Sequence, residues 1–383
     1  YIMARNRVIY QSEGLFVSHD AASTGATGID GAPNVQQIER VQSANFSYTI
    51  NRQDINQFGD LSRIDSVIMD APTVSTDFSY YLTDGFNERL LGFYVRTGGG
   101  KRASESQFAS GHMLASSGKN VFILTGPEGK DLNGATTGTN HSCIGIGNCY
   151  VSDYTVDLAV GSIPTVSVSM EGANVRSDNT TDGGNFVNSP AVNQENGVPL
   201  DTVIKLPTPG GGASTIKALR PGDVSVALTN IDGETIANLS AGEDGAHVQS
   251  VSINMPLSRS PLQRLGSRFP FAREVDFPIN VSMSVSALVN EETDMNLANT
   301  LTSGVQNATV TLAKKGSVGA TGAPAIVYTL KGAKIDSESM SSSIGSNKTV
   351  DLTLSAQVGG IDDASAGLFV SGASTSGAFE LFA

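Results

Sequence analysis

Apolar and small polar residues alternate along several short stretches of the chain. In residues 73–82, Val74, Phe78, Tyr80 and Leu82 take the apolar positions, with Thr, Ser and Asp between them. Three further stretches follow the same pattern: residues 165–171, 279–286 and 349–355. A period of two is typical of a β-strand with one face in the core and the other in water. The pattern predicts a mainly β protein.

Helical patterns are short and few. Residues 87–94 follow a turn at Asp84-Gly85 and predict one short helix. Residues 294–301 predict a second, with Thr293 or Asp294 as its N-cap. Each follows a predicted pair of strands. We therefore expect each helix to flank a β-sandwich or open barrel.

The strand pattern occurs twice along the chain. A shift of 207 positions lays residues 41–82 over residues 248–289 and keeps the apolar positions in phase. A shift of 184 positions lays residues 161–170 over 345–354 in the same way. Residues 120–124 resemble residues 308–312 more loosely. We predict a duplicated unit, although two unrelated sandwiches of alternating Ser and Val could align similarly.

The duplication divides the chain into three parts. Residues 1–175 form the first predicted β unit, and residues 213–383 form the second. Residues 176–212 are rich in Asn, Gly and Pro and are expected to form a linker or long loop. The predicted architecture is therefore two tandem β-sandwich or open-barrel units, each with a short flanking helix.

Composition narrows the possible functions. The formal net charge is −13, and only 16% of the 383 residues are charged. Clamping nucleic acid or lying on an anionic membrane needs clustered Lys and Arg, so neither is expected. We find no membrane span and no signal-peptide core in the sequence. The polar faces of the predicted strands carry Ser, Thr and Asn with almost no Lys or Arg, unlike an ordinary soluble surface.

Catalytic and metal-binding chemistry is sparse. His19, His112, His141 and His247 lie in no recognisable motif, and residues 98–102 lack the Ser or Thr that a phosphate-binding loop requires. The two cysteines, Cys143 and Cys149, allow a zinc site, a local disulfide or two free, half-buried thiols beside a strand. We favour the free thiols. We therefore expect no enzyme activity, no metal and no cofactor.

Four stretches resemble the tail tube proteins of tailed bacteriophages: residues 3–13, 41–58, 70–77 and 161–166. The resemblance implies small β-sandwich units that assemble in rings of six, with their inner sheets closing into one barrel that conducts DNA. A duplicated chain would need three copies, which implies homotrimeric rings stacked into a tube. The second unit departs from the family pattern, because Pro256 and Pro261 interrupt its first matched stretch.

The resemblance also implies partners and a location. The expected partners are the tail terminator, the tape measure protein, and baseplate or distal tail proteins. Double-stranded DNA would pass without tight binding, and no membrane would be involved. The protein would be assembled in the host cytoplasm and would lie in the phage tail of the virion. Four inner strands per unit would give a barrel of about 24 strands, roughly 48 Å across the backbone.

Parity along the strands selects the residues expected to face this channel. They are the polar members of the alternating stretches: Ser43, Asn45, Ser47, Asp77, Ser79, Asp157, Glu171, Ser252, Asn254, Ser284 and Asp351. In the alternative arrangement these faces point outward into solvent. Two other functions also fit the composition: another virion part, such as a capsid decoration or baseplate protein, or a bacterial surface adhesin.

Overall fold

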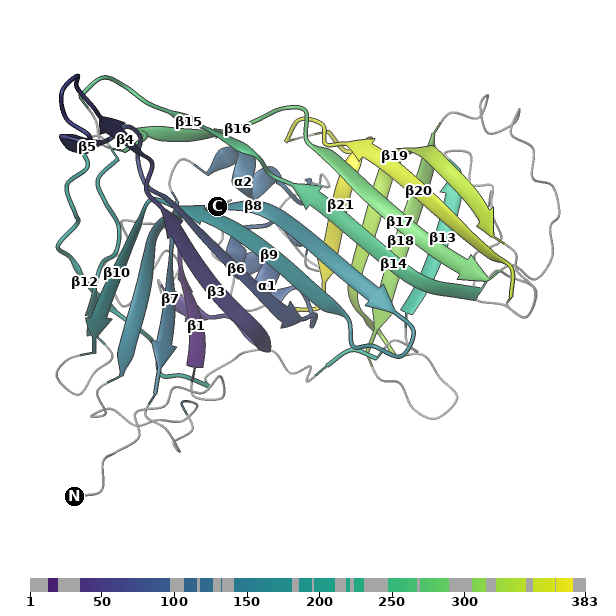
Figure 1. Ribbon diagram of the computed structural model, residues 1–383. Coiled ribbons are helices and arrows are strands. Elements are labelled where there is room, and N and C mark those ends of the chain that lie inside the picture. The colour runs from purple at the N-terminus through teal and green to yellow at the C-terminus, as the bar shows by residue number, and fades with distance from the viewer. Residues whose placement is uncertain are drawn as a thin grey trace.

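Strands predominate in the structure, which is a computed structural model (Figure 1). The structure describes residues 13–19, 35–96, 107–115, 118–126, 132, 141–180, 186–194, 196–210, 218–220, 224–230, 247–266, 269–288, 305–314, 322–341, 347–361 and 363–374. The mainly β class expected from the alternating pattern is confirmed.

Among the described residues, the N-terminal half contains ten strands and two helices. The strands are β1 (Glu13–Ser18), β2 (Val35–Gln37), β3 (Val41–Thr49), β4 (Arg52–Ile55), β5 (Asp65–Ile68), β6 (Thr73–Tyr81), β7 (Lys119–Thr125), β8 (Ser142–Ala159), β9 (Thr165–Gly172) and β10 (Asn174–Asn179). The helices are α1 (Phe86–Leu91) and α2 (Ser110–Leu114).

The short strands β11 (Phe186–Asn188) and β12 (Val203–Lys205) follow, and the C-terminal half then supplies nine more. These are β13 (Val224–Asn230), β14 (His247–Pro256), β15 (Arg259–Leu262), β16 (Ala272–Val275), β17 (Asn280–Leu288), β18 (Gln306–Ala313), β19 (Pro324–Ser341), β20 (Thr349–Gln357) and β21 (Gly367–Gly372).

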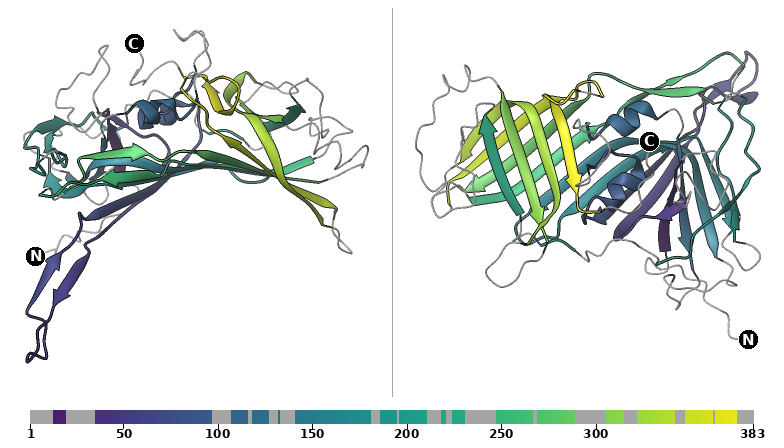
Figure 2. Two further views of the ribbon diagram at one scale, coloured as in Figure 1. Left: turned by 90° about the horizontal axis from the view of Figure 1, so that it is seen from above. Right: turned by 180° about the vertical axis from the view of Figure 1, so that it is seen from behind.

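One antiparallel sheet runs through both halves, and we call it the long sheet. Its strand order is β3-β6-β9-β8-β14-β17-β20-β19. The first four strands come from the N-terminal half and the last four from the C-terminal half. The sheet bends into an arc, with α1 and α2 on its convex side (Figure 2). Each half therefore contributes four strands to this sheet, and the two sets are joined edge to edge within one chain.

Strands β8 and β19 each take part in two sheets. The first part of β8 pairs with β7 and β10 in an outer sheet, and the first part of β19 pairs with β18 and β21 in another. At matching positions both strands adopt a left-handed backbone, with φ 54° at Asn148 and 68° at Gly332. Asn and Gly tolerate that conformation best, so both strands can bend there between layers. Each half is thus a two-layer sandwich.

The two halves share the same strand registers. The bulge between Val41 and Ser43 on β3 reappears between Val248 and Ser250 on β14, at the shift of 207. The pair Tyr154↔Val168 corresponds to Glu338↔Leu352 at the shift of 184. The repeat therefore extends to individual backbone pairs. The limits of the units, 1–175, 176–212 and 213–383, stay predictions.

Two finer expectations from the sequence differ from the structure. Val121↔Ile146 corresponds to Ala308↔Leu330, so β7 maps onto β18 with a shift of 187, one residue less than the loose match between 120–124 and 308–312. The interruption attributed to prolines occurs in both halves, since β3 ends before β4 just as β14 ends before β15. The break is therefore a property of the unit and does not depend on proline.

The first predicted helix is confirmed as α1, which lies between two left-handed glycines, Gly85 and Gly92. The second, at 294–301, lies outside the described residues. The short helix α2 was not predicted. Nearby backbone groups attach this region to the C-terminal half: the Phe108 N–H donates to the Leu368 carbonyl at 2.8 Å. The region that contains both helices thus contacts β21, in the outer sheet of the C-terminal half.

The segment 176–212 is partly folded. It contains the end of β10 and the two-stranded sheet of β11 and β12. Val187, Ile204 and Leu206 are buried in a cluster with Phe16 and Phe122 of the first outer sheet. The described part of this segment is therefore a packed loop, held against the N-terminal half by apolar contacts, and not an extended linker.

Candidate assembly surface

The eleven residues selected by parity all lie on one face of the long sheet, which we call the polar face. The pairing registers show this directly: Asn45 lies opposite Asp77, and Ser252 lies opposite Asp157. The other face belongs to the core, where side chains such as Val168 and Ile253 are buried. The core covers only one face of the long sheet, which explains why apolar and polar residues alternate along its strands.

Short side chains on the polar face bond to one another across neighbouring strands. The Ser43 and Ser79 hydroxyls lie 2.7 Å apart, and those of Ser47 and Ser75 lie 2.8 Å apart. The Ser252 hydroxyl donates to the Asp157 carboxylate at 2.7 Å. These polar groups satisfy each other's hydrogen bonds within the sheet.

The charges on the polar face are mostly acidic. Asp77, Asp157 and Asp351 were selected from the sequence, and the structure adds Asp153, whose carboxylate accepts from the Asn254 amide at 3.0 Å. Alternation along β8 could have identified Asp153, but the bulge between Val151 and Asp153 breaks the parity there. Lys334, on the outermost strand, is exposed on the same face.

Glu171 differs from the other selected carboxylates. Its side chain forms an ion pair with Arg273 of β16, with 2.9 Å between nitrogen and oxygen. The Arg273 side chain is only 8% exposed, so it is held in place by its surroundings. Glu171 is therefore a neutralised contact point for the β15–β16 hairpin and adds little negative charge to the polar face.

The two edges of the long sheet are open. Among the described residues, β3 pairs only with β6, and the second part of β19 pairs only with β20. On the core side of these edges, Phe46 is 38% exposed, Tyr48 63% and Met340 38%. Phe46 and Tyr48 alternate with the selected residues Asn45 and Ser47, so they lie on the apolar side as the parity predicts. No neighbouring strand in the described part of the chain covers them.

At the joint inside the chain, the corresponding sheet edge is covered by a second unit. Strands β8 and β14 form seven consecutive pairs, from Ser250↔Ala159 to Pro256↔Asp153. Ile253 and Met255, which correspond to Phe46 and Tyr48 at the shift of 207, are both 0% exposed. Positions that are open on β3 are thus fully buried on β14, where another unit lies alongside.

A hairpin reinforces this joint. The β15–β16 hairpin of the C-terminal half reaches the N-terminal half, where Arg259 stacks 4.8 Å from the centre of the Tyr150 ring. Arg259 also donates to the His112 carbonyl at 2.9 Å. The corresponding β4–β5 hairpin projects away from the sheet (Figure 2), and its apolar tip residues Phe58 and Leu61 are fully exposed.

A buried polar cluster lies where the two halves meet. The Tyr80 hydroxyl donates to Glu88 at 2.8 Å, and the Tyr154 hydroxyl donates to the same oxygen at 3.3 Å. The Tyr328 hydroxyl, from the C-terminal half, lies 2.9 Å from that of Tyr154. Burial raises the pKa of Glu88 to about 7, although the bond from Tyr80 opposes the shift.

The cysteines lie in the first part of β8. Both are free thiols and both are buried, at 1% exposed, so the favoured free state is confirmed while the expected half-burial is wrong. Burial raises the pKa of each thiol to about 12. Their side chains point into packed layers, which leaves them unreactive near neutral pH.

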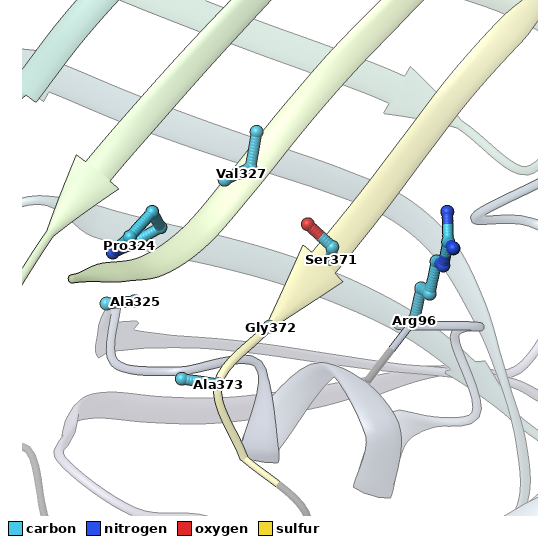
Figure 3. Close-up of a pocket in the computed structure, with 7 residues that line it drawn as sticks. All are labelled: Arg96, Pro324, Ala325, Val327, Ser371, Gly372 and Ala373. Atoms are coloured by element: carbon cyan, nitrogen blue, oxygen red, sulfur yellow. The ribbon is translucent and has the colours of Figure 1, made fainter. Parts of the chain in front are cut away.

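Conventional ligand sites are sparse in the part of the chain that the structure describes. No group of three metal-ligating side chains is found there, and the 98–102 stretch lies outside it. A hollow beside the ends of β19 and β21 is lined by seven residues, of which only Arg96 is ionisable (Figure 3). Neither described helix has the length and apolar character to cross a bilayer.

Comparison with known proteins gives similarity to solved structures without a family match. No protein-family model and no curated protein matches the chain. A chain in the cryo-EM structure of the anti-feeding prophage baseplate is 16% identical, covering 39% of this chain and 93% of that chain, with a TM-score of 0.27. A crystal structure of Hcp protein is 13% identical over 39% of this chain and 98% of that chain, with a TM-score of 0.24. Similarity at this level carries no argument about function.

Proposed function

We propose that this protein is a structural subunit of a phage tail tube, without a catalytic role. Three copies close into a ring, the long sheets join into one barrel, and stacked rings enclose a channel for DNA. The protein would thus belong to the tail of the virion. The joint between β8 and β14 carries this proposal, because it shows one unit docking on the next through its sheet edge.

The open edges favour self-assembly. Strand β3 corresponds to β14 and the second part of β19 corresponds to β8, so the two ends of the long sheet match the two sides of the internal joint. Joining β19 of one copy to β3 of the next is a head-to-tail contact, and such contacts close into rings when the rotation allows. Closure also removes unpaired strand edges, which otherwise promote aggregation.

The size of the ring suits a channel. Three copies of the eight-stranded long sheet give 24 strands and a barrel roughly 48 Å across the backbone. The short side chains of the polar face would narrow the opening to roughly 40 Å. The number three comes from the family resemblance, and the arc of the long sheet in Figure 2 supports a closed form.

The chemistry of the polar face supports passage of DNA without capture. Its hydroxyl groups are bonded within the sheet, and its unpaired charges are mainly Asp77, Asp153, Asp157 and Asp351. Such a surface repels phosphates weakly over a Debye length of about 10 Å at 0.1 M salt. DNA would remain centred in the channel, because few cations could bind its phosphates.

Negative-stain electron microscopy of the purified chain tests this proposal. The expected result is rings, and at high concentration tubes, with a stain-filled channel. Phe46→Asp is the control that should leave only single chains, because it places a charge on the open edge. Rings that never stack would favour a baseplate or other virion role. Single chains at all concentrations would contradict the proposal and leave the adhesin alternative.

A further inference from the structure

The joint inside the chain predicts which residues meet in the joint between two copies, provided that the proposed ring exists. A shift of 184 positions carries β8 onto the second part of β19, and a shift of 207 carries β3 onto β14. Both shifts reproduce the observed pairs and bulges of the two halves. The register between β8 and β14 can therefore be transferred to β19 and β3.

We infer that β3 of one copy pairs antiparallel with the second part of β19 of the next copy, with Phe46 opposite Met340, Ser47 opposite Ser339 and Tyr48 opposite Glu338. The corresponding pairs inside the chain are Ile253↔Val156, Asn254↔Thr155 and Met255↔Tyr154.

Exposure on the core side supports this register. Phe46 and Met340 are each 38% exposed, whereas their counterparts Ile253 and Val156 are 0% exposed. In the transferred register these two exposed apolar side chains cover each other. Mutual burial of apolar surface is the main favourable contribution to such a contact.

Glu338 gives the register its chemical specificity. It opposes Leu352, so it lies on the core side of the sheet, at the position where Tyr154 is 0% exposed in the N-terminal half. A carboxyl group buried by the next copy needs a hydrogen-bond donor. The opposing Tyr48 has a hydroxyl that can supply it, as the Tyr80 hydroxyl does for Glu88.

On the polar face the new joint differs from the internal one. Asp157 and Asp153, which line the internal joint, correspond to Ser341 and Ser337 at the shift of 184. The joint between copies would therefore present serines to the channel. The ring would alternate acidic joints within chains and neutral joints between them.

Cysteine cross-linking in the full chain tests the register. The double variant Ser47→Cys with Ser339→Cys is assembled and then oxidised, and the products are separated without reductant. A disulfide needs Cα atoms closer than about 7 Å, so this variant should give covalent dimers and closed trimers. The native thiols are buried and do not interfere. The matched control, Asn45→Cys with Ser337→Cys, is four residues out of register and should give at least about tenfold less product.

The outcomes separate this inference from the proposed function. Rings that cross-link in the control but not in the Ser47/Ser339 variant would overturn the register and leave the ring intact. Cross-linking by Ser47→Cys alone would show β3 pairing with β3, which contradicts a head-to-tail joint. A wild-type chain that stays single, or that assembles only with another protein, would overturn both.

Compensating substitutions give a second test. Tyr48→Phe removes the donor to Glu338 and should raise the concentration needed for half-assembly about tenfold. Adding Glu338→Met, which restores an apolar pair like the internal one, should recover assembly. If Tyr48→Phe has no effect, or if Glu338→Met fails to rescue it, the two side chains do not meet.

Discussion

The joint between β8 and β14 and the open edges at β3 and β19 are two versions of one structure. They share strand registers, bulges and apolar parity, yet the same positions are buried in the joint and exposed at the edges. The difference is the presence of a neighbouring unit, which the C-terminal half supplies to the N-terminal half within the chain. In the proposed ring, these exposed positions are half of a contact that a second copy completes.

Equivalent substitutions at the two places should have opposite consequences. Ile253→Asp puts a charge into the closed joint, where the side chain is 0% exposed, and should destabilise the chain by about 4 kcal/mol or more. Phe46→Asp, at the matching position on the open edge, should change the free energy of unfolding by about 1 kcal/mol or less while abolishing rings. Denaturant unfolding and particle mass measure the two effects. Equal destabilisation by both changes would contradict the distinction.

The buried polar cluster around Glu88 should make stability depend on pH. The pKa of Glu88 rises from 4.5 to about 7 on folding, so the folded state favours the protonated acid. This stabilisation is complete below about pH 4.5 and is lost as pH rises through about 7, a change of about 3 kcal/mol. Glu88→Gln should remove this dependence, as unfolding measured across that range will show. An unchanged pH profile in the variant would exclude Glu88 as its source.

The two hairpins offer a smaller contrast. Arg259→Ala removes the stacking on Tyr150 and the bond to the His112 carbonyl, and should cost about 1–2 kcal/mol. It should also expose the β15–β16 hairpin to proteases. Arg52→Ala, at the corresponding position on the projecting β4–β5 hairpin, is the control and should change neither. Protection of the β15–β16 hairpin in Arg259→Ala would show that other contacts hold it.

Charge reversal on the polar face should leave folding almost unchanged. Asp77→Lys together with Asp351→Lys should alter stability by about 0.5 kcal/mol or less, because both sites are exposed. Assembled rings should then retain duplex DNA at low salt, protected from nuclease, and release it as salt is raised. The wild type should retain none. DNA that is bound but fully digestible would place these residues on the outside of the ring.

Alternation in the sequence predicted the parity of most strands of the long sheet. On β6, β9, β17 and β20 most apolar residues are buried, and most polar residues are exposed or half-buried, as expected. The helix α1 and the two shifts of the repeat could also be predicted from the sequence. These features depend on local periodicity, which the sequence records directly.

Other features depend on contacts that local patterns do not contain. The full length of β8 and β19 was missed, because a bulge and a left-handed residue break the alternation where each strand changes sheet. Parity placed Phe46 on the apolar side but could not show whether a neighbour covers it. The pairing of Glu171 with Arg273 joins residues 102 positions apart, and no spacing rule connects them.

The mass of the assembled particle tests most directly whether the sheet edges pair. Native mass spectrometry of the full chain should show a main species of three times the 39.7 kDa chain mass, with multiples of it as rings stack. Phe46→Asp should shift the signal to the single chain. A wild-type protein that stays at 39.7 kDa at every concentration, or that forms closed dimers, would contradict the edge-to-edge ring.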